Sequence, residues 1–552
     1  MSRFSISRWW CVALVICMHL SVMDAHSAER PPISIIPKPL ELELRDGTFT
    51  VSSTTVIFYD NSQPEGRRLA EYLAGLLYRA TGYFLTINTA EPSHQTSQSI
   101  YLSFNTGDAS LGAEGYTIDI SSRSILMNAA EPAGLFHALQ TFRQLLSPDI
   151  ELTAGQISEA DQALPGIFIR DIPRYPWRGF MLDVSRTFYN VDVLKQFIDV
   201  MALYKLNQLH LHLADDQGWR VEIPKYPRLT GIGAHFHPKY GDPEQFSGFY
   251  TRQELKDLVS YAEARYVTIL PEIDMPGHAW GALVAYPELS VSGNPQPAEV
   301  FPYSSQRSIF EGHTIDTLDP TKEAVYTFID DVLSELIEIF PSPYIHIGGD
   351  EVRFSVWEGR PHIQAFLKEH KLKDLHALQS YFIHRVNDIV RSKGRTMMGW
   401  NEITYGGLPE GAVVTAWQGA DKVKLSTSLG ARTVVGTNVP LYMNFWQDEA
   451  HTGMLGDRKQ GTLRDVYTYT PEEGLTDKEQ QLILGIQAAM WTHVARHLKD
   501  IQMAIFPRFL AVAEQGWTVR ERKNFEDFTQ RLQGQYKRLD NLGISYWKPP
   551  QQ

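Results

Sequence analysis

The pattern of apolar and polar positions changes character early in the chain. In the first part, short apolar stretches such as Thr50–Tyr59 and Ser99–Phe104 have the character of strands. Gly66–Thr81 instead repeats leucines at helical spacing, and Gly82 follows it as a stop signal. This mixture predicts a small α+β domain. A segment rich in glycine, proline and polar residues at 147–165 then marks a domain boundary.

Beyond the boundary, apolar strands and amphipathic helices alternate regularly, which predicts parallel strands. Eight such units over about 350 residues are typical of a (β/α)8 barrel. Helix starts are indicated by Asp192, by a capping box of Thr251 and Glu254, and by Asp319-Pro320. The strand candidates are Gly179–Asp183, Leu206–Leu213, Tyr266–Glu272, Tyr344–Ile347, Thr396–Trp400, Val413–Trp417, Arg432–Thr437 and Leu482–Met490.

The chain therefore divides into three segments. Residues 1–28 combine a positive start with an apolar stretch, Trp9–Val22, that is short for a membrane span, which predicts a signal peptide. Residues 29–168 form the α+β accessory domain, and residues 169–545 form the barrel. We expect the mature chain to be exported, to the bacterial periplasm or the medium, and to carry no membrane span.

Composition narrows the possible partners and chemistry. The formal net charge is −13 and the sequence has no basic stripe, which argues against a nucleic-acid partner. Both cysteines, Cys11 and Cys17, lie in the signal segment, so the mature chain has no disulfide and no cysteine metal site. The aromatic fraction of 11% fits a large core, and it also fits a site that stacks the apolar faces of sugar rings.

Acidic, polar and aromatic residues follow the carboxyl end of every predicted barrel strand. This rim carries the chemistry of (β/α)8 enzymes. Any single residue could be structural, but recurrence after all eight strands favours one site. In chain order the residues are Asp183 and Arg186; His212, Asp215, Asp216 and Trp219; Glu272, Asp274 and His278; Asp350 and Glu351; Trp400 and Glu402; Trp417; Tyr442 and Asn444; and Trp491 and His493.

These residue types point to a glycoside hydrolase. Tryptophan walls suit sugar rings, and Arg, Asp and Asn suit sugar hydroxyls. The set contains no nucleophilic cysteine and no glycine-rich phosphate loop. Most glycoside hydrolases place two carboxylates on either side of the scissile bond. Asp350 and Glu351 are adjacent, so we do not expect them to flank it, and one of them must have another role.

Four segments carry a more specific resemblance. They are RG at 178–179 with LDVSR at 182–186, LHLHLADDQGWR at 209–220, EIDMPGH at 272–278 and HIGGDE at 346–351. With these motifs in this order, the chain resembles the family 20 β-N-acetylhexosaminidases over nearly its whole mature length. The resemblance implies a small α+β (zincin-like) domain before a (β/α)8 TIM barrel. It also implies a glycan substrate with a terminal N-acetylhexosamine, no cofactor and no metal.

The resemblance also implies catalytic roles. In this family the acetamido oxygen of the substrate is the nucleophile, so catalysis is retaining and substrate-assisted. Glu351 matches the general acid, and we expect burial and the charge of Asp350 to raise its pKa. Asp350 itself matches the residue that bonds the acetamide N–H and stabilises the oxazolinium-like intermediate. Asp215 and His278 match a pair that supports the acid.

Further residues match the family's sugar-binding positions. Arg186 matches the arginine that binds the 3- and 4-hydroxyls, and Tyr442 matches the hydroxyl that faces the acetamide. Trp400, Trp417 and Trp491 match the walls of the pocket. The residues that we expect to give structural support are Asp183, His212 and Asp274.

Two positions depart from the commonest family pattern. Asn444 stands where the family often has Asp, and His493 stands where it usually has Glu. Losing two anionic acceptors predicts that the pocket accepts a 6-sulfated sugar, because Asn and protonated His can donate hydrogen bonds to a sulfate. Family members that accept 6-sulfated sugars carry Asn at the first position. A relaxed preference between GlcNAc and GalNAc, or reduced activity, is the alternative.

Three other interpretations remain open. A metal-dependent barrel hydrolase would use His212, His278 and nearby aspartates, although the first strand lacks the His-x-His pair expected for it. A non-catalytic sugar-binding protein on the same fold is disfavoured by the presence of Glu351. Release of lacto-N-biose is a variant activity of the same family.

Overall fold

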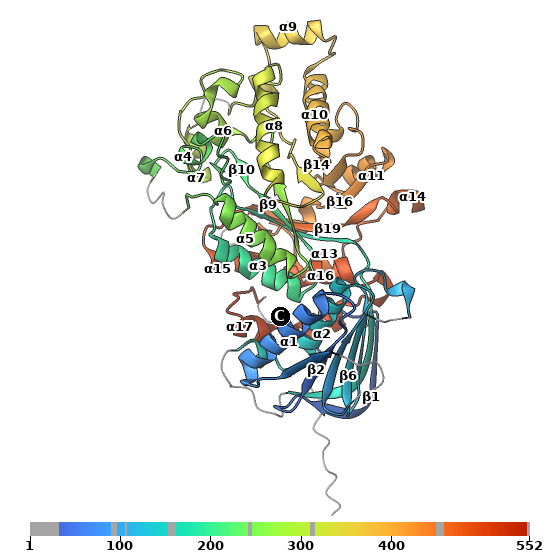
Figure 1. Ribbon diagram of the computed structural model, residues 1–552. Helices are drawn as coiled ribbons and strands as arrows, with labels where there is room; N and C mark the ends of the chain where they lie inside the picture. Colours follow the sequence, from blue (N-terminus) through green and yellow to red (C-terminus); the bar gives the residue numbers. More distant parts are fainter. Residues whose placement is uncertain are drawn as a thin grey trace, which may run out of the picture. The chain divides into compact units, whose positions relative to one another are not determined.

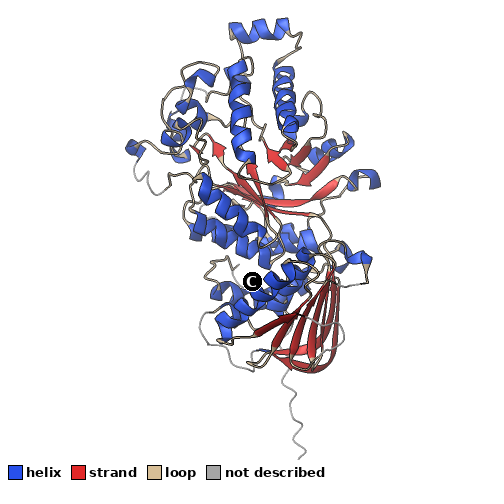
Figure 2. Ribbon diagram, viewed as in Figure 1, coloured by secondary structure: helices blue, strands red, loops and turns tan. Residues whose placement is uncertain are grey.

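The computed structural model describes residues 33–89, 96–104, 107–152, 162–240, 246–309, 315–448 and 457–548. The predicted signal peptide at 1–28 lies outside them. No helix in the described residues is both long and apolar enough to cross a membrane. Figures 1 and 2 show an open sheet with two helices, followed in the chain by a barrel of strands with helices around it.

The first part of the chain forms a mixed seven-stranded sheet in the order β1-β7-β5-β6-β4-β2-β3. The β1, β7, β5 and β6 strands pair antiparallel, and β6, β4, β2 and β3 pair parallel. The strand bounds are β1 Glu41–Thr50, β2 Val56–Tyr59, β3 Thr86–Thr89, β4 Ser99–Ser103, β5 Tyr116–Ile120, β6 Ser124–Ala129 and β7 Ala163–Asp171.

Helices α1 (Glu65–Thr81) and α2 (Pro132–Leu145) pack on this sheet. In α2 every residue from Gly134 to Gln144 is buried, because one side faces the sheet and the other side faces the barrel. Gln144 donates from Nε2 to the carbonyl of Leu203 in the barrel helix α3. The predicted α+β domain is therefore correct, although Thr50–Tyr59 is the end of one strand, a turn and a second strand.

Eight parallel strands close the barrel in the order β8-β9-β12-β13-β14-β15-β16-β19. This confirms the predicted (β/α)8 barrel and each of its eight strands. Their bounds are β8 Trp177–Asp183, β9 Gln208–His212, β12 Thr268–Glu272, β13 Tyr344–His346, β14 Thr396–Trp400, β15 Val413–Ala416, β16 Arg432–Val435 and β19 Ile483–Met490.

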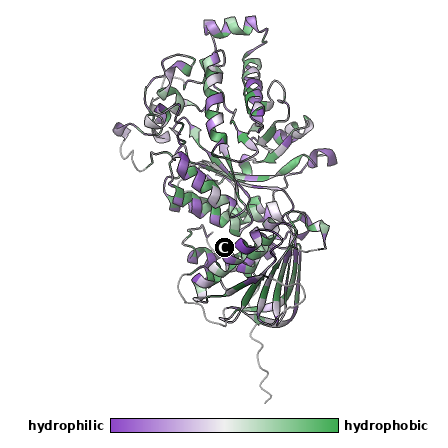
Figure 3. Ribbon diagram, viewed as in Figure 1, coloured by the Kyte–Doolittle hydropathy of each residue, from purple (hydrophilic) through white to green (hydrophobic). Residues whose placement is uncertain are grey.

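The helices around the barrel show mixed hydrophobic and hydrophilic residues along their length, as Figure 3 shows, because only one side of each faces the strands. They include α3 Val191–Leu203, α5 Arg252–Glu263, α8 Glu323–Ile337, α10 Leu375–Ser392, α11 Ala420–Ser428, α16 Arg508–Trp517 and α17 Phe525–Asn541. The capping box of Thr251 and Glu254 is confirmed. Two other predicted starts are wrong: Asn190 caps α3, and α8 begins at Glu323 because Asp319 instead accepts from Thr321.

The interior of the barrel changes from apolar to polar toward the carboxyl ends of the strands. Apolar side chains from β8, β12, β14, β15 and β16 pack together at one level. At the next level, strand register sets Glu272 beside His212 and His346. Glu272 contacts both of these histidines, His210, and the indole N–H of Trp400. This buried polar layer supports the rim above it.

Candidate active site

Two glycines give the adjacent carboxylates different surroundings. After β13 the chain passes through Gly348 and Gly349 with φ of 65° and 95°, a region open to glycine. A Cβ on Gly348 would lie 1.7 Å from Asp274 Oδ1. Glu351 has φ of 44°, an unusual conformation that is enriched at functional sites. As a result Asp350 is buried at 8% exposure, whereas the Glu351 side chain is 58% exposed.

Asp350 lines a cavity at the rim although its carboxyl is buried. Its Oδ1 has no hydrogen-bond partner among the described residues. Burial raises its pKa, and the charge of Glu351 adds to this effect against the opposing effect of His278. Burial and the charge of Asp350 likewise raise the pKa of Asp274 well above its ordinary value. The two aspartates therefore compete for a proton, and Asp350 keeps one oxygen for a ligand.

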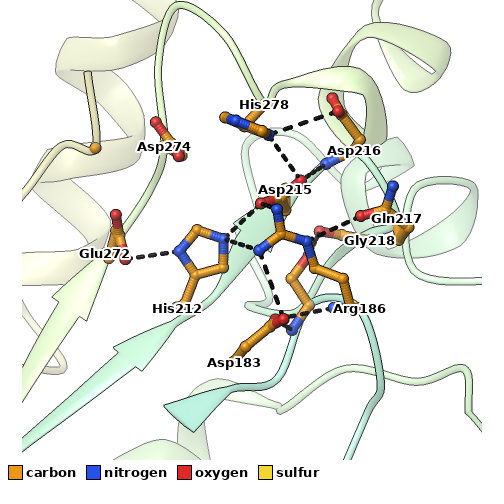
Figure 4. Close-up of polar contacts among 12 residues, drawn as sticks. Asp183, Arg186, His212, Asp215, Asp216, Gln217, Gly218, Glu272, Asp274 and His278 are labelled. Atoms are coloured by element: carbon orange, nitrogen blue, oxygen red, sulfur yellow. Dashed lines mark hydrogen bonds and ion pairs between the residues drawn. The ribbon is translucent and has the colours of Figure 1, made fainter. Parts of the chain in front are cut away.

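Asp215 is the centre of a cluster of contacts with Arg186, His212 and His278 (Figure 4). His278 Nε2 lies 3.5 Å from Glu351 Oε2, and His278 Nδ1 lies 3.2 Å from Asp215 Oδ1. Arg186 Nη2 and His212 Nε2 approach Asp215 Oδ2 at 2.6 and 2.7 Å. Burial alone lowers the pKa of His278, but Asp215 raises it well above its ordinary value. His278 is therefore a cation next to Glu351.

The pKa of Glu351 lies below its ordinary value, which corrects the expectation from the sequence. The hydrogen bond with His278 is the largest cause, and it outweighs the effect of burial. The neighbouring carboxylate, Asp350, is not among the main causes, and the charge of Arg186 lowers the pKa of Glu351 further. Glu351 is therefore ionised while it is open to solvent.

Aromatic rings line the cavity, whose volume is about 260 Å³. The rings of Trp417 and Tyr442 are nearly parallel, with centroids 6.1 Å apart, and Trp491 lies edge-on to Tyr442 at 6.0 Å. Trp400 does not line the cavity. It is 1% exposed, packs on Trp491 and donates to Glu272. Trp400 thus supports the wall from behind.

Glu402 fixes one of these walls. Its Oε2 accepts a hydrogen bond from Trp417 Nε1 at 3.0 Å, and its Oε1 accepts one from Gln418 Nε2 at 2.9 Å. Burial, together with the negative charge of Asp350, raises the pKa of Glu402 to about 8. Glu402 is therefore largely protonated at neutral pH, although it lies among acids that are ionised.

The other predicted residues, Arg186, Asn444 and His493, also line the cavity. The ring of His493 lies 4.7 Å from that of Tyr303, which belongs to helix α7 (Tyr303–Ile309). Asp216, which the strand-end pattern included, also lines the cavity. Lining residues that this pattern did not include are Gln217, Tyr303, Gln306, Arg353, Asn438 and Phe445. Gln217 lies inside one of the four recognised motifs, which was a usable signal. Tyr303 and Gln306 belong to the long connection between β12 and β13, where no sequence pattern indicated a site.

Acidic and histidine side chains crowd closely enough here to hold a cation, for example Asp215, Asp216 and His278. Charge argues against that use. Arg186 lies 2.6 Å from Asp215, and His278 is itself protonated, so positive charge already occupies the surroundings of these carboxylates. The arrangement is better suited to holding and moving a proton than to binding a metal ion.

Two family models match the chain. The catalytic domain of glycosyl hydrolase family 20 matches residues 175–520, and domain 2 of the same family matches residues 32–172. The chain belongs to glycoside hydrolase family 20. It is therefore a glycoside hydrolase, in agreement with the four motifs and the barrel.

Individual members of family 20 are similar over most of their length. A β-hexosaminidase of Porphyromonas gingivalis is 34% identical over 98% of this chain and 68% of that protein. A β-N-acetylhexosaminidase of Cellulomonas fimi is 31% identical over 94% of this chain and 97% of that protein. The solved family 20 β-N-acetylhexosaminidase of Streptomyces coelicolor superposes with a TM-score of 0.80 at 33% identity, covering 94% of this chain and 98% of that one.

Proposed function

We propose that this family 20 hydrolase is an exo-acting β-N-acetylhexosaminidase that removes terminal β-linked GlcNAc or GalNAc with retention of configuration. The observation that carries the proposal is the different environment of two adjacent carboxylates. Glu351 is exposed beside the cationic His278, whereas Asp350 is buried with one oxygen left for a ligand. The names of the relatives support this activity. A cavity of about 260 Å³ suits a single sugar ring, which fits action at a chain end.

Glu351 is the general acid and base of the proposed reaction. It protonates the glycosidic oxygen as the bond to C1 breaks, and later takes a proton from the attacking water. A bound sugar removes water from Glu351 and so shifts its pKa upward from the low value of the solvated site. The protonated His278, held by Asp215, is the nearest proton source.

Asp350 binds and orients the acetamide of the substrate. Its buried Oδ1 accepts the acetamide N–H, which turns the acetamide oxygen toward C1 for attack. Its negative charge then stabilises the cationic oxazolinium-like intermediate. Water opens this intermediate and gives the β-anomer. Tyr442, which also lines the cavity, supplies a hydroxyl beside the same group.

The test is the dependence of rate on the nucleophilicity of the acetamide. We compare 4-nitrophenyl β-GlcNAc with its N-trifluoroacetyl analogue, whose carbonyl oxygen is a weaker nucleophile. A steep fall in kcat/KM is expected for the analogue, and NMR should show the β-anomer as the first product. Equal rates on both substrates would mean that a protein carboxylate is the nucleophile and would overturn the mechanism.

We further propose that the far side of the pocket accepts a 6-sulfate. Asn444 and His493 line the cavity where the family commonly has acids, so two repelling charges are missing. Arg353 lines the same cavity, and no carboxylate among the described residues pairs with it. An anion there would gain charge-assisted hydrogen bonds.

The ratio of kcat/KM on 6-sulfated and plain 4-nitrophenyl β-GlcNAc tests this proposal. Asn444→Asp should lower that ratio by about tenfold or more, because it restores one repelling charge. Asn444→Gln is the matched neutral control and should leave the ratio closer to that of the natural chain. A strong preference of the unaltered enzyme for the plain sugar would overturn the proposal.

A further inference from the structure

A second cavity of about 230 Å³ lies on the side of the barrel away from the rim. It is bounded by the end of helix α13 (Leu463–Thr468), by the segment after α16 and by the start of α17. Arg174, just before β8, completes it, and its backbone N–H bonds the carbonyl of Trp517 at the end of α16. Because β8 runs from here toward the rim, this cavity lies at the amino ends of the barrel strands.

Three basic side chains line this cavity, namely Arg174, Arg520 and Lys523, and none of the lining residues is acidic. Arg174 Nη2 forms an ion pair with Glu472 Oε1 at 2.6 Å. Lys523 bonds two neutral acceptors, the carbonyl of Tyr467 and the side-chain oxygen of Gln515. No carboxylate among the described residues pairs with Lys523 or Arg520. In a chain of net charge −13, a cavity lined by three basic side chains and no acid is a local concentration of positive charge, although Glu472 and Glu514 act on Lys523 from outside the lining.

The surroundings of this cavity disfavour the charged form of Lys523. Burial lowers the pKa of Lys523 to about 8. The charge of Arg174 and, less strongly, that of Arg520 add to this effect, and the charges of Glu514 and Glu472 oppose it. An anion in the cavity would reduce the repulsion among the three cations and use their remaining N–H donors. The first turn of the 17-residue helix α17 begins at Phe525 on the same wall, but Glu526 and Asp527 in that turn offset its positive end.

The remaining walls suit a sugar. Tyr469 and Phe525 are half-buried and present aromatic surface to the cavity. The hydroxyls of Thr468 and Thr470 donate to the carbonyls of Arg464 and Thr468, so their oxygens remain as acceptors for a sugar hydroxyl. Aromatic surface beside hydroxyl acceptors and cationic donors is the combination that recognises a pyranose carrying an acidic group. The volume is below that of most drug-sized ligand pockets, which fits one charged sugar unit.

We propose that this basic cavity is a second binding site, specific for the sulfate or carboxylate of an acidic saccharide. Arg520 and Lys523 bind the oxyanion, Arg174 closes one side, and Tyr469 and Phe525 contact the sugar ring. The site lies outside the rim pocket and needs no hydrolysis. It would hold an acidic region of a glycan while the rim acts on a terminal sugar.

Direct binding to the full chain tests the proposal, by calorimetry at low salt with galactose 6-sulfate, galactose and inorganic sulfate as probes. None of the three is a hexosaminide, so the rim cleaves none of them, and the Arg520 variant separates binding in this cavity from binding at the rim. Arg520→Gln should raise the Kd for galactose 6-sulfate by about tenfold, because a charge-assisted contact is lost. Arg522→Gln is the matched control: it removes the same charge two residues away, from a side chain that bonds the carbonyl of Leu40 outside the cavity.

The control should change the Kd by about twofold at most, since an exposed distant charge is screened. Both variants should keep the kcat/KM of the natural chain on 4-nitrophenyl β-GlcNAc, which also shows that they are folded. Tighter binding of galactose 6-sulfate than of sulfate supports the saccharide site. Equal affinity for galactose 6-sulfate and inorganic sulfate would mean that the cavity binds free oxyanions, and it would overturn the saccharide part of the proposal. Absence of binding, equal binding of galactose, or equal losses in the two variants overturns the proposal as a whole.

Discussion

The rim pocket and the basic cavity concentrate charge of opposite sign, and the same physics acts in both. At the rim, burial and the negative charge of Asp350 raise the pKa of Glu402 to about 8. In the basic cavity, burial and nearby cations lower the pKa of Lys523 to about 8. An acid and a base with very different ordinary pKa values thus titrate in the same pH range, because burial disfavours the charged form of each and a like charge nearby adds to that effect.

The two regions differ in how that charge is balanced. The rim carries its own counter-ions, since Arg186 and His278 both contact Asp215. In the basic cavity no lining residue is acidic, and neither Arg520 nor Lys523 forms an ion pair among the described residues, although the charges of Glu472 and Glu514 act on Lys523. The rim is therefore organised before substrate arrives, as catalysis requires. The basic cavity is completed only by a ligand, as in a binding site.

Removing the acid at the rim should have the largest effect. Glu351→Gln keeps the shape of the side chain but cannot give up a proton, so kcat should fall by about 10³-fold, within the usual range for general acid catalysis. Binding of a terminal GlcNAc should persist, measurable by calorimetry. Residual activity near that of the unaltered enzyme would remove Glu351 from the proposed role.

Asp350→Asn should have a smaller effect, on a different step. The amide keeps the volume but loses the charge that stabilises the intermediate, so kcat should fall by about 10²-fold. The effect should be greatest for substrates with an unmodified acetamide and small for the N-trifluoroacetyl analogue. A uniform loss on both substrates would mean that Asp350 serves the structure of the rim instead.

Much of the rim could be predicted from the sequence, because parallel strands bring their carboxyl ends to one edge. Asp215, His278, Asp350 and Glu351 all lie where strand periodicity places them. The low pKa of Glu351 could not be predicted, since it depends on His278 and Arg186. Adjacent positions in the sequence suggested that Asp350 would set the pKa of Glu351, whereas the contact with His278 is the largest cause.

Other features had no regular pattern to indicate them. The first eight residues of β1 are exposed, so burial does not alternate along most of this strand. Tyr303 and Gln306 reach the rim from a connection rather than from a strand end. The basic cavity joins Arg174 to residues between 293 and 351 positions later in the chain, and no local spacing reveals such a meeting.

The pH dependence of stability should distinguish the two regions, with the larger effect at the rim. Between its ordinary pKa of 4.5 and its folded value of about 8, Glu402 is protonated in the folded chain and ionised in the unfolded one. The free energy of unfolding should therefore fall as pH rises, by up to about 1.4 kcal/mol per pH unit from this residue. Glu402→Gln should remove that slope. Parallel curves of unfolding free energy against pH for the two chains would contradict it.

Lys523 should give a smaller effect of opposite sign. From its folded pKa of about 8 to its ordinary value of 10.5, the folded chain holds the neutral amine while the unfolded chain binds a proton. The free energy of unfolding from this residue should therefore rise with pH over that interval, by less than about 1.4 kcal/mol per unit because Lys523 is partly exposed. Lys523→Met should remove the rise and stabilise the chain most at neutral pH. Saturating galactose 6-sulfate should shift the interval to higher pH in the natural chain only, since the anion favours the ammonium form. If saturating galactose 6-sulfate leaves this pH interval unchanged, the titration of Lys523 is not coupled to anion binding.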